Sequence, residues 1–192
     1  MLQKQFCLVH HYREGTRLSI VIDNLRRRCR EICPDADTPK MGNHTTLLPP
    51  FRAHPDEMRN FATGLAIARA LYNKEDPSSY AITGAIDFYR NPNSDACVVE
   101  VVLPKSYHDM IEECRRQLSD FNEWVFPLLG EVYRPHICIL EGVDLHGQLL
   151  PNLQELSTIA PPTGFLLPFP KIMMKESCGD SSHWIEFCPP PH

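Results

Sequence analysis

The stretch MGNHTTLLPPF, residues 41–51, has the pattern of a short apolar strand that opens on a histidine and runs into two prolines. Side chains of a strand alternate between its two faces. His44 and Thr46 are therefore predicted on one face, with Thr45 and Leu47 on the other. The strand would present one imidazole and one hydroxyl to a common side.

A second stretch, YRPHICILEG at residues 133–142, repeats this arrangement. The same alternation places His136 and Cys138 on one face of a strand and Ile137 and Ile139 on the other. Two such strands side by side would bring two imidazoles together. Acid/base cleavage of a phosphodiester needs such a pair, because one group removes a proton from the attacking oxygen and another protonates the leaving oxygen. A polar group two residues along each strand, about 6 to 7 Å away, would bind the phosphate.

Hydrophobic spacing predicts the remaining elements. Apolar residues three and four positions apart indicate helices over about 16–33, 55–72, 105–121 and 151–159. Strands are predicted over 5–11, 43–50, 79–89, 96–103, the second histidine stretch, 169–176 and 183–188, and Gly84 is expected to mark a bulge or a close backbone approach.

This element order runs strand, helix, histidine strand, helix, strand in each half, with one further strand at the end. The repetition predicts an α+β fold of two pseudo-symmetric lobes of βαβ-type units, with mainly antiparallel sheets that form a central cleft. Residues 1–192 are expected to form one bilobal domain.

Composition limits the partners. The chain has 192 residues, 43% hydrophobic and 22% charged, which is typical of a globular protein and excludes global disorder. A net charge of -5 argues against gripping long nucleic acid by overall charge, but allows a small phosphate ligand or a strand end. No signal peptide or membrane span is apparent, so a cytoplasmic protein is expected, with its eight cysteines as reduced thiols.

HTTL at residues 44–47 and HICI at residues 136–139 resemble the paired His-x-Thr/Ser-apolar motifs of the 2H phosphoesterase superfamily. The resemblance is closest to its 2'-5' RNA ligase-like branch, beside the cyclic phosphodiesterases. It implies a metal-independent phosphodiesterase that acts on a nucleotide or RNA end, either at a 2',3'-cyclic phosphate or at a 2'-5' linkage. No cofactor is expected, and the protein is expected to be a monomer. The implied catalytic acid and base are His44 and His136, and the implied phosphate-binding residues are Thr46 and Cys138.

Cys138 departs from the family motif, because a thiol is a weaker hydrogen-bond donor than a hydroxyl. One alternative is therefore a non-catalytic module that binds an RNA end or nucleotide through a degenerate second motif. Two others are a zinc site built from histidines and thiols, and two histidines that only pack in the core.

Several further residues leave two interpretations open. Tyr133 and Arg134 precede the second motif and would either bind substrate or pack at the strand edge. His10 and His11 lie on the first predicted strand, where either one of them approaches the cleft or, as we expect, each has a core or surface position. The basic run of the first helix forms either a solvated face or a phosphate-binding patch: Arg26, Arg27, Arg28 and Arg30.

Overall fold

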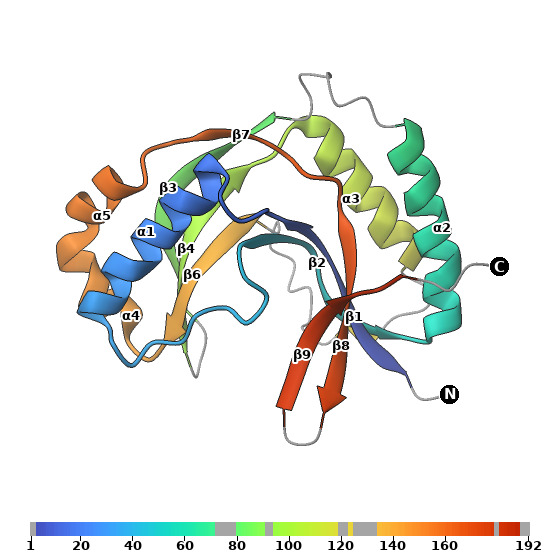
Figure 1. The fold of residues 1–192 in the computed structure, drawn as a ribbon, viewed down its shortest axis with the longest axis horizontal. Helices are drawn as coiled ribbons and strands as arrows, with labels where there is room; N and C mark the ends of the chain where they lie inside the picture. The colour runs from blue at the N-terminus through green and yellow to red at the C-terminus, as the bar shows by residue number, and fades with distance from the viewer. Residues whose placement is uncertain are drawn as a thin grey trace.

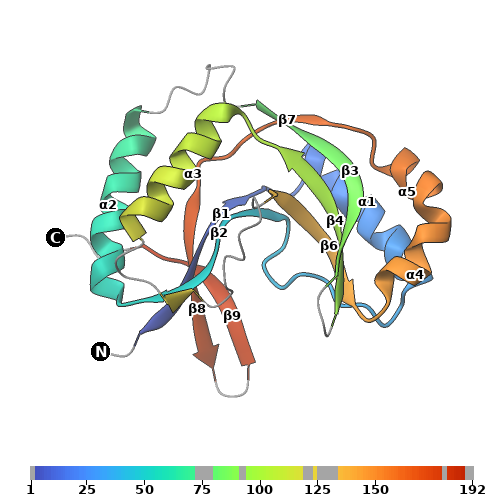
Figure 2. The same cartoon turned by 180° about the vertical axis from the view of Figure 1, so that it is seen from behind.

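The structure is a computed structural model that describes residues 3–71, 80–90, 94–118, 123–124, 134–178 and 181–188. Its helices and strands alternate along the chain as an α+β protein (Figures 1 and 2). In chain order they are β1 (Lys4–His11), α1 (Arg17–Ile32), β2 (His44–Ala53), α2 (Pro55–Leu71), β3 (Tyr80–Arg90), β4 (Asp95–Val102), α3 (Lys105–Leu118), β5 (Glu123–Trp124), β6 (His136–Gly142), α4 (Leu145–Leu149), a 3-10 helix (Leu150–Asn152), α5 (Leu153–Ile159), β7 (Gly164–Leu166), β8 (Lys171–Cys178) and β9 (Ser181–Glu186).

The strands form one antiparallel sheet in the order β7-β3-β4-β6-β2-β1-β8-β9, with β5 paired to β2. The predicted antiparallel α+β architecture is confirmed. The first-half strands β1 and β2 lie beside the second-half strand β6, which in turn pairs with β4. The sheet therefore brings the two histidine strands, far apart in sequence, next to each other.

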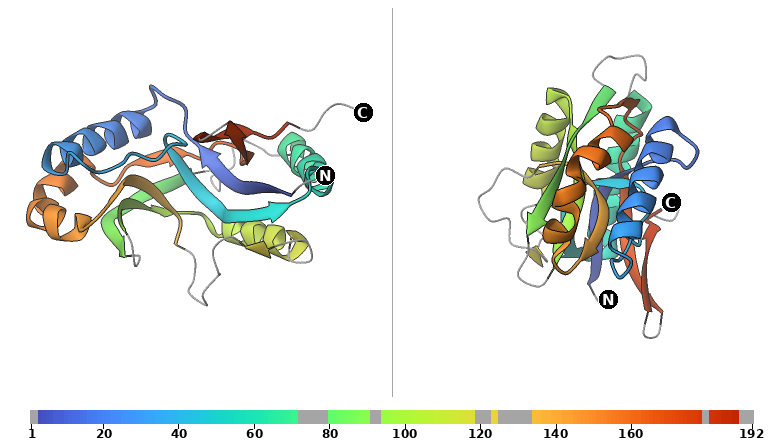
Figure 3. Two further views of the ribbon diagram at one scale, coloured as in Figure 1. Left: turned by 90° about the horizontal axis from the view of Figure 1, so that it is seen from below. Right: turned by 90° about the vertical axis from the view of Figure 1, so that its left-hand side faces the viewer.

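The helices gather at the two ends of the molecule, with α1, α4 and α5 at one end and α2 and α3 at the other (Figure 3). Their apolar side chains pack with inward-facing strand residues in one large core, to which α1 contributes Leu18, Ile22 and Leu25. Phe6 and Leu8 of β1 join this core. Cys7 and Val9 alternate with them and belong to a separate small cluster on the other face of the sheet.

Strand β2 corrects one expectation, because it continues through Pro49 and Pro50 to Ala53 instead of ending at Pro50. The pairing with β1 shifts register here, since Phe6 lies opposite Phe51 while Leu8 lies opposite Leu48. The extra residue in β2 forms a bulge, where a missing proline N–H breaks no ladder hydrogen bond. A bulge lets prolines sit inside a strand that pairs on both sides.

The expected role of Gly84 is confirmed. It lies where the β3–β4 register shifts between Thr83 and Ile86. A Cβ atom at this position would lie 2.9 Å from the Cβ of Glu100 on β4, so the close approach needs glycine. Glu100 itself lies opposite His136 of β6, which puts this contact beside the second histidine.

Helix α1 begins where the sequence predicts, because the backbone N–H of Ser19 donates to Thr16 Oγ1 at 3.3 Å and caps the helix.

The two closing strands extend closer to each other along the chain than their predicted bounds, 169–176 and 183–188, with Cys178 of β8 opposite Ser181 of β9. Helix α4 and strand β7 were not predicted, since five and three residues show too little periodicity. The predicted end of the third helix, at residues 119–121, lies outside the described residues. Among the described helices, none has the length and apolar character needed to cross a bilayer.

Candidate functional site

The two histidine strands are direct neighbours in the sheet. Thr45 of β2 lies opposite Ile137 of β6 in an antiparallel pair. Residues that flank an opposed pair also meet across the strands and point to the other face. The four site residues predicted from sequence flank this pair, and the structure brings them to one face: His44, Thr46, His136 and Cys138.

Burial follows the predicted alternation. Thr45 and Ile137 are 0% exposed and point into the core, where the Tyr12 hydroxyl is 2.7 Å from the Thr45 hydroxyl. His44 and His136, one residue before each, are only partly buried. The apolar face fixes the strands in the core and leaves the imidazoles on the open face.

Each imidazole is held by a main-chain carbonyl two residues earlier. His44 Nδ1 lies 3.1 Å from the oxygen of Gly42, and His136 Nδ1 lies 2.9 Å from the oxygen of Arg134. A carbonyl only accepts, so in each contact Nδ1 carries the proton and donates. Nε2 is left to exchange a proton with a ligand. Gly42 has φ +72°, which favours glycine at the turn that presents its carbonyl.

The surroundings lower the pKa of both histidines. Burial disfavours the charged imidazolium of each, although the Gly42 and Arg134 carbonyls partly oppose this effect. The nearby His136 lowers the pKa of His44 further. Both imidazoles therefore favour the neutral form near pH 7, in which one can accept a proton at once.

A third histidine faces the same region. His11 of β1 lies opposite His44, and its ring lowers the pKa of His44. His10 points the other way and is 0% exposed in the core, beside the Tyr107 ring at 5.1 Å. The alternation of β1 separates these neighbours, but the sequence could not show which strand lies beside His44.

Tyr89 of β3 packs on the second histidine. Its ring meets that of His136 edge to face, with centroids 4.7 Å apart, and its hydroxyl donates to the oxygen of Arg134 at 3.4 Å. Arg134 Nη1 lies 3.9 Å from Glu100 Oε1, so the predicted substrate-binding arginine is exposed beside an acid. Tyr133, its predicted companion, lies outside the described residues.

Cys138 has a carboxylate partner that the sequence did not predict. Its Sγ donates to Glu141 Oε1 at 3.6 Å and to the oxygen of Leu140 at 3.7 Å. Burial and the charge of Glu141 raise the pKa of the thiol above its usual range. Position 138 therefore holds a neutral thiol that is already engaged, close to a negative charge.

Arg26 of α1 ties the two histidine strands together. Its Nε donates to the oxygen of Ile139 and its Nη2 to the oxygen of Cys138, both at 3.1 Å. Its Nη1 donates to Asn43 Oδ1 at 2.9 Å, in the residue before His44. Arg26 therefore belongs neither to a solvated helix face nor to a phosphate-binding patch, the two interpretations open from the sequence, because its guanidinium N–H groups donate to protein oxygens.

Arg28, in contrast, lies on the helix surface and pairs with Glu31 and Glu155. The described ranges contain no group of three or more histidines, cysteines or acids arranged to hold a metal ion. Within the described residues, these cysteines are free thiols: Cys7, Cys29, Cys33, Cys97, Cys114, Cys138 and Cys188.

Comparison with solved structures shows that the chain shares its fold, over nearly its whole length, with several proteins of known structure. One match is TT0787 of Thermus thermophilus, with a TM-score of 0.56 and 15% identity over 95% of this chain and 94% of that one. Usb1 of Kluyveromyces marxianus, solved with uridine monophosphate, matches with a TM-score of 0.50 and 12% identity over 96% of this chain and 98% of that one.

A third match is ATU0111 of Agrobacterium tumefaciens, a conserved protein of unknown function, with a TM-score of 0.52 and 16% identity over 97% of this chain and 85% of that one. At these identities the likeness is one of fold. No protein-family model matches the sequence, and no curated protein matches it.

Proposed function

We propose that the protein is a metal-independent phosphodiesterase that acts on a nucleotide or RNA end, at a 2',3'-cyclic phosphate or a 2'-5' linkage. His44 and His136 are its general acid and base, and Thr46 and Cys138 bind the phosphate. The site occupies a central cleft between two pseudo-symmetric lobes of the chain.

One observation carries this proposal: two imidazoles on neighbouring antiparallel strands share one face, and each Nδ1 is bound to a carbonyl. Each ring thus offers only Nε2 to a ligand. A phosphodiester bound between them would receive one proton donor and one acceptor, the arrangement that in-line cleavage requires. The fold match to Usb1, solved with uridine monophosphate, supports a nucleotide as the ligand.

The proton balance follows from these two nitrogens. A neutral Nε2 of one histidine takes a proton from the attacking water, whose oxygen forms the new bond to phosphorus. The protonated Nε2 of the other gives its proton to the leaving ribose oxygen as the old P–O bond breaks. Thr46 donates a hydrogen bond to a non-bridging oxygen while the charge moves.

A second function, binding without turnover, is favoured by the contact between Cys138 and Glu141. The thiol already donates to a carboxylate at 3.6 Å, and a negative charge beside a bound phosphate opposes its binding. In this alternative the second motif binds an RNA end weakly, and the histidines do not catalyse hydrolysis.

A substrate panel separates the two functions. The purified protein, in EDTA, is incubated with nucleoside 2',3'-cyclic phosphates, 2'-5'-linked oligonucleotides and matched 3'-5'-linked ones. The proposal expects hydrolysis of at least one of the first two classes at an undiminished rate in EDTA. Binding without product across the whole panel would contradict it and support the binding module, and a rate abolished by EDTA would contradict metal independence.

A further inference from the structure

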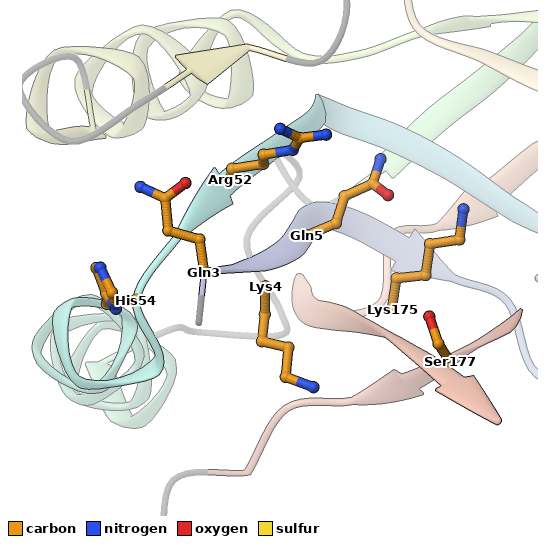
Figure 4. Close-up of a pocket in the computed structure, with 7 residues that line it drawn as sticks. All are labelled: Gln3, Lys4, Gln5, Arg52, His54, Lys175 and Ser177. Carbon is orange, nitrogen blue, oxygen red and sulfur yellow. The ribbon is translucent and has the colours of Figure 1, made fainter. Parts of the chain in front are cut away.

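A basic hollow of about 660 Å³ lies where β1, β2 and β8 meet, at the end of β2 that is away from His44 (Figure 4). The cationic side chains among its described lining residues are Lys4, Arg52 and Lys175, and none of these described lining residues is an acid. The amides of Gln3 and Gln5 add hydrogen-bond donors. The lining residues within the described part of the chain are Gln3, Lys4, Gln5, Arg52, His54, Lys175 and Ser177.

Strand β1 connects this hollow to the histidines on one face of the sheet. Gln5 lies opposite Arg52 of β2 and Lys175 of β8, and Figure 4 shows these three side chains rising on one side of the strands. The pairing of β1 with β8 runs without a break from Gln5 to Val9, and the pairing with β2 is regular from Val9 to His11; the two register shifts before Val9 place their extra residues in β2 and not in β1. Even spacing in a regular strand keeps Gln5 and His11 on one face, about 20 Å apart.

A small apolar cluster lies between the two ends. Cys7, Val9 and Met173 are buried there, with the partly buried side chains of Met41 and Trp184 packed against them. Trp184 lies directly opposite Lys175, so the two side chains leave the sheet on the same face. Bases stack on aromatic rings while nearby cations hold the backbone, and this combination is typical of single-strand binding.

Between the hollow and the histidines, Lys175 is a better candidate for binding an anion than Lys171, the lysine nearer to the histidines. Lys171 of β8 lies closer to the histidines, opposite Val9, but its Nζ is 2.6 Å from Glu186 Oε2. Lys175 has no carboxylate within ion-pair distance among the residues that the structure describes. Its charge is available for an anion that enters the hollow.

We propose that the hollow around Lys175 is a second phosphate-binding subsite, which holds the sugar-phosphate chain of an oligonucleotide several nucleotides away from the bond between the two histidines. The natural substrate is then a single-stranded oligonucleotide end and not a free mononucleotide. Lys175 binds a backbone phosphate, and Trp184 stacks on a base next to it. This inference rests on the proposed function for the site at the other end.

The test compares Lys175→Glu with Lys105→Glu. Lys105 is an exposed lysine at the start of α3, a helix that packs on the core face of the sheet, so both variants change the net charge equally. Substrates are a mononucleotide cyclic phosphate and single-stranded oligonucleotides of increasing length that end in the same group. Affinity for non-cleavable oligonucleotides of the same lengths is measured by fluorescence anisotropy over a range of salt concentrations.

We expect affinity and kcat/KM of the wild type to rise with length until the chain spans about 20 Å. In Lys175→Glu the advantage of the long over the short substrate falls at least about tenfold, and the salt slope of oligonucleotide binding falls by about 0.7. Lys105→Glu keeps the wild-type advantage of the long substrate and the wild-type salt slope. Equal effects of the two variants, or no dependence on length, would overturn the subsite.

The two proposals fail differently. If nothing is hydrolysed but long oligonucleotides bind in a Lys175-dependent way, the phosphodiesterase proposal is wrong and the subsite stands. If short and long substrates are hydrolysed equally well, the subsite is wrong and the phosphodiesterase proposal stands.

Discussion

At the scale of single residues, both histidines use the same local device. Gly42 and Arg134, each two positions before its histidine, present a carbonyl that fixes the Nδ1 proton. The second members of the motifs differ, because Cys138 is already hydrogen-bonded to Glu141. The two halves of the site are thus equivalent at the imidazole and unequal at the second residue of the motif.

Replacing the thiol by a hydroxyl tests this inequality. Cys138→Thr is expected to raise kcat/KM several-fold, because a hydroxyl is the stronger donor to a phosphate oxygen. Steady-state hydrolysis of the best substrate from the panel measures the effect. Cys188→Thr, at an exposed cysteine, is the matched control and should leave the rate as it is. A rate that falls in Cys138→Thr would show that the thiol is the better group in this site.

The histidines also predict the pH dependence. One must be neutral and the other protonated, so kcat/KM is highest between the two pKa values of the pair. Burial lowers both pKa values from the usual 6.5, since it disfavours the charged form. The pH profile of kcat/KM should therefore peak below pH 6.5. A maximum well above pH 7 would mean that these two groups do not set the limbs of the profile.

At the scale of elements, α1 acts as a clamp on the histidine strands through one side chain. Arg26 donates to two successive carbonyls of β6 and to the side-chain oxygen of Asn43, the residue just before β2. These bonds join strands that share only the pair Thr45 and Ile137 in their ladder. The helix thereby fixes the relative position of the two imidazoles.

Arg26→Lys is expected to lower kcat about tenfold or more while KM changes little, because an ammonium cannot reproduce the planar fork and the imidazoles lose their mutual alignment. Steady-state kinetics and thermal unfolding are measured together. Arg27→Lys, at an exposed neighbour whose Nη2 donates to Asn24 Oδ1 on the same helix, serves as the control. Loss of stability with an unchanged kcat in the remaining folded protein would show that Arg26 has a purely structural role.

The sequence predicted helices and strands well where the side-chain pattern of a single segment determines its structure. Alternation placed His44 and Thr46 correctly, and the apolar stripe with Thr16 located α1. The sequence-based prediction failed where a structural feature depends on two segments that are distant in the sequence. Pro50 continues β2 only because a bulge against β1 relieves it, and the functions of Arg26 and Tyr89 depend on strands that are distant in sequence.

At the scale of the whole molecule, the sheet has one face covered by the helices and another that carries the histidines and the basic hollow. The sequence predicted two lobes, and the idea that the two histidine strands lie side by side came from their chemistry, because pairing between distant strands such as β2 and β6 leaves no periodic pattern in a sequence. The continuous sheet turns two separate motifs into one site.

The stability of the whole fold should depend on pH through His10. Burial lowers its pKa to about 4 in the folded protein, against about 6.5 in the unfolded chain. The unfolded chain therefore binds the proton first, and stability is lost as pH falls from about 6.5 to 4, by about 3 kcal/mol. Urea unfolding at pH 7 and pH 4 measures this loss. His10→Phe should lose about 3 kcal/mol less than the wild type on acidification, and an equal loss in both proteins would contradict the assignment.

The central claim is that two histidines on neighbouring strands cleave a phosphodiester. Its most direct test is the rate of hydrolysis of one oligonucleotide with a terminal 2',3'-cyclic phosphate by the wild type, His44→Ala and His136→Ala, in EDTA. His108→Ala, at an exposed histidine of α3, is the control. We predict that each site variant loses at least about a hundredfold in kcat while the control keeps the wild-type rate. Near wild-type hydrolysis by either His44→Ala or His136→Ala would contradict the claim.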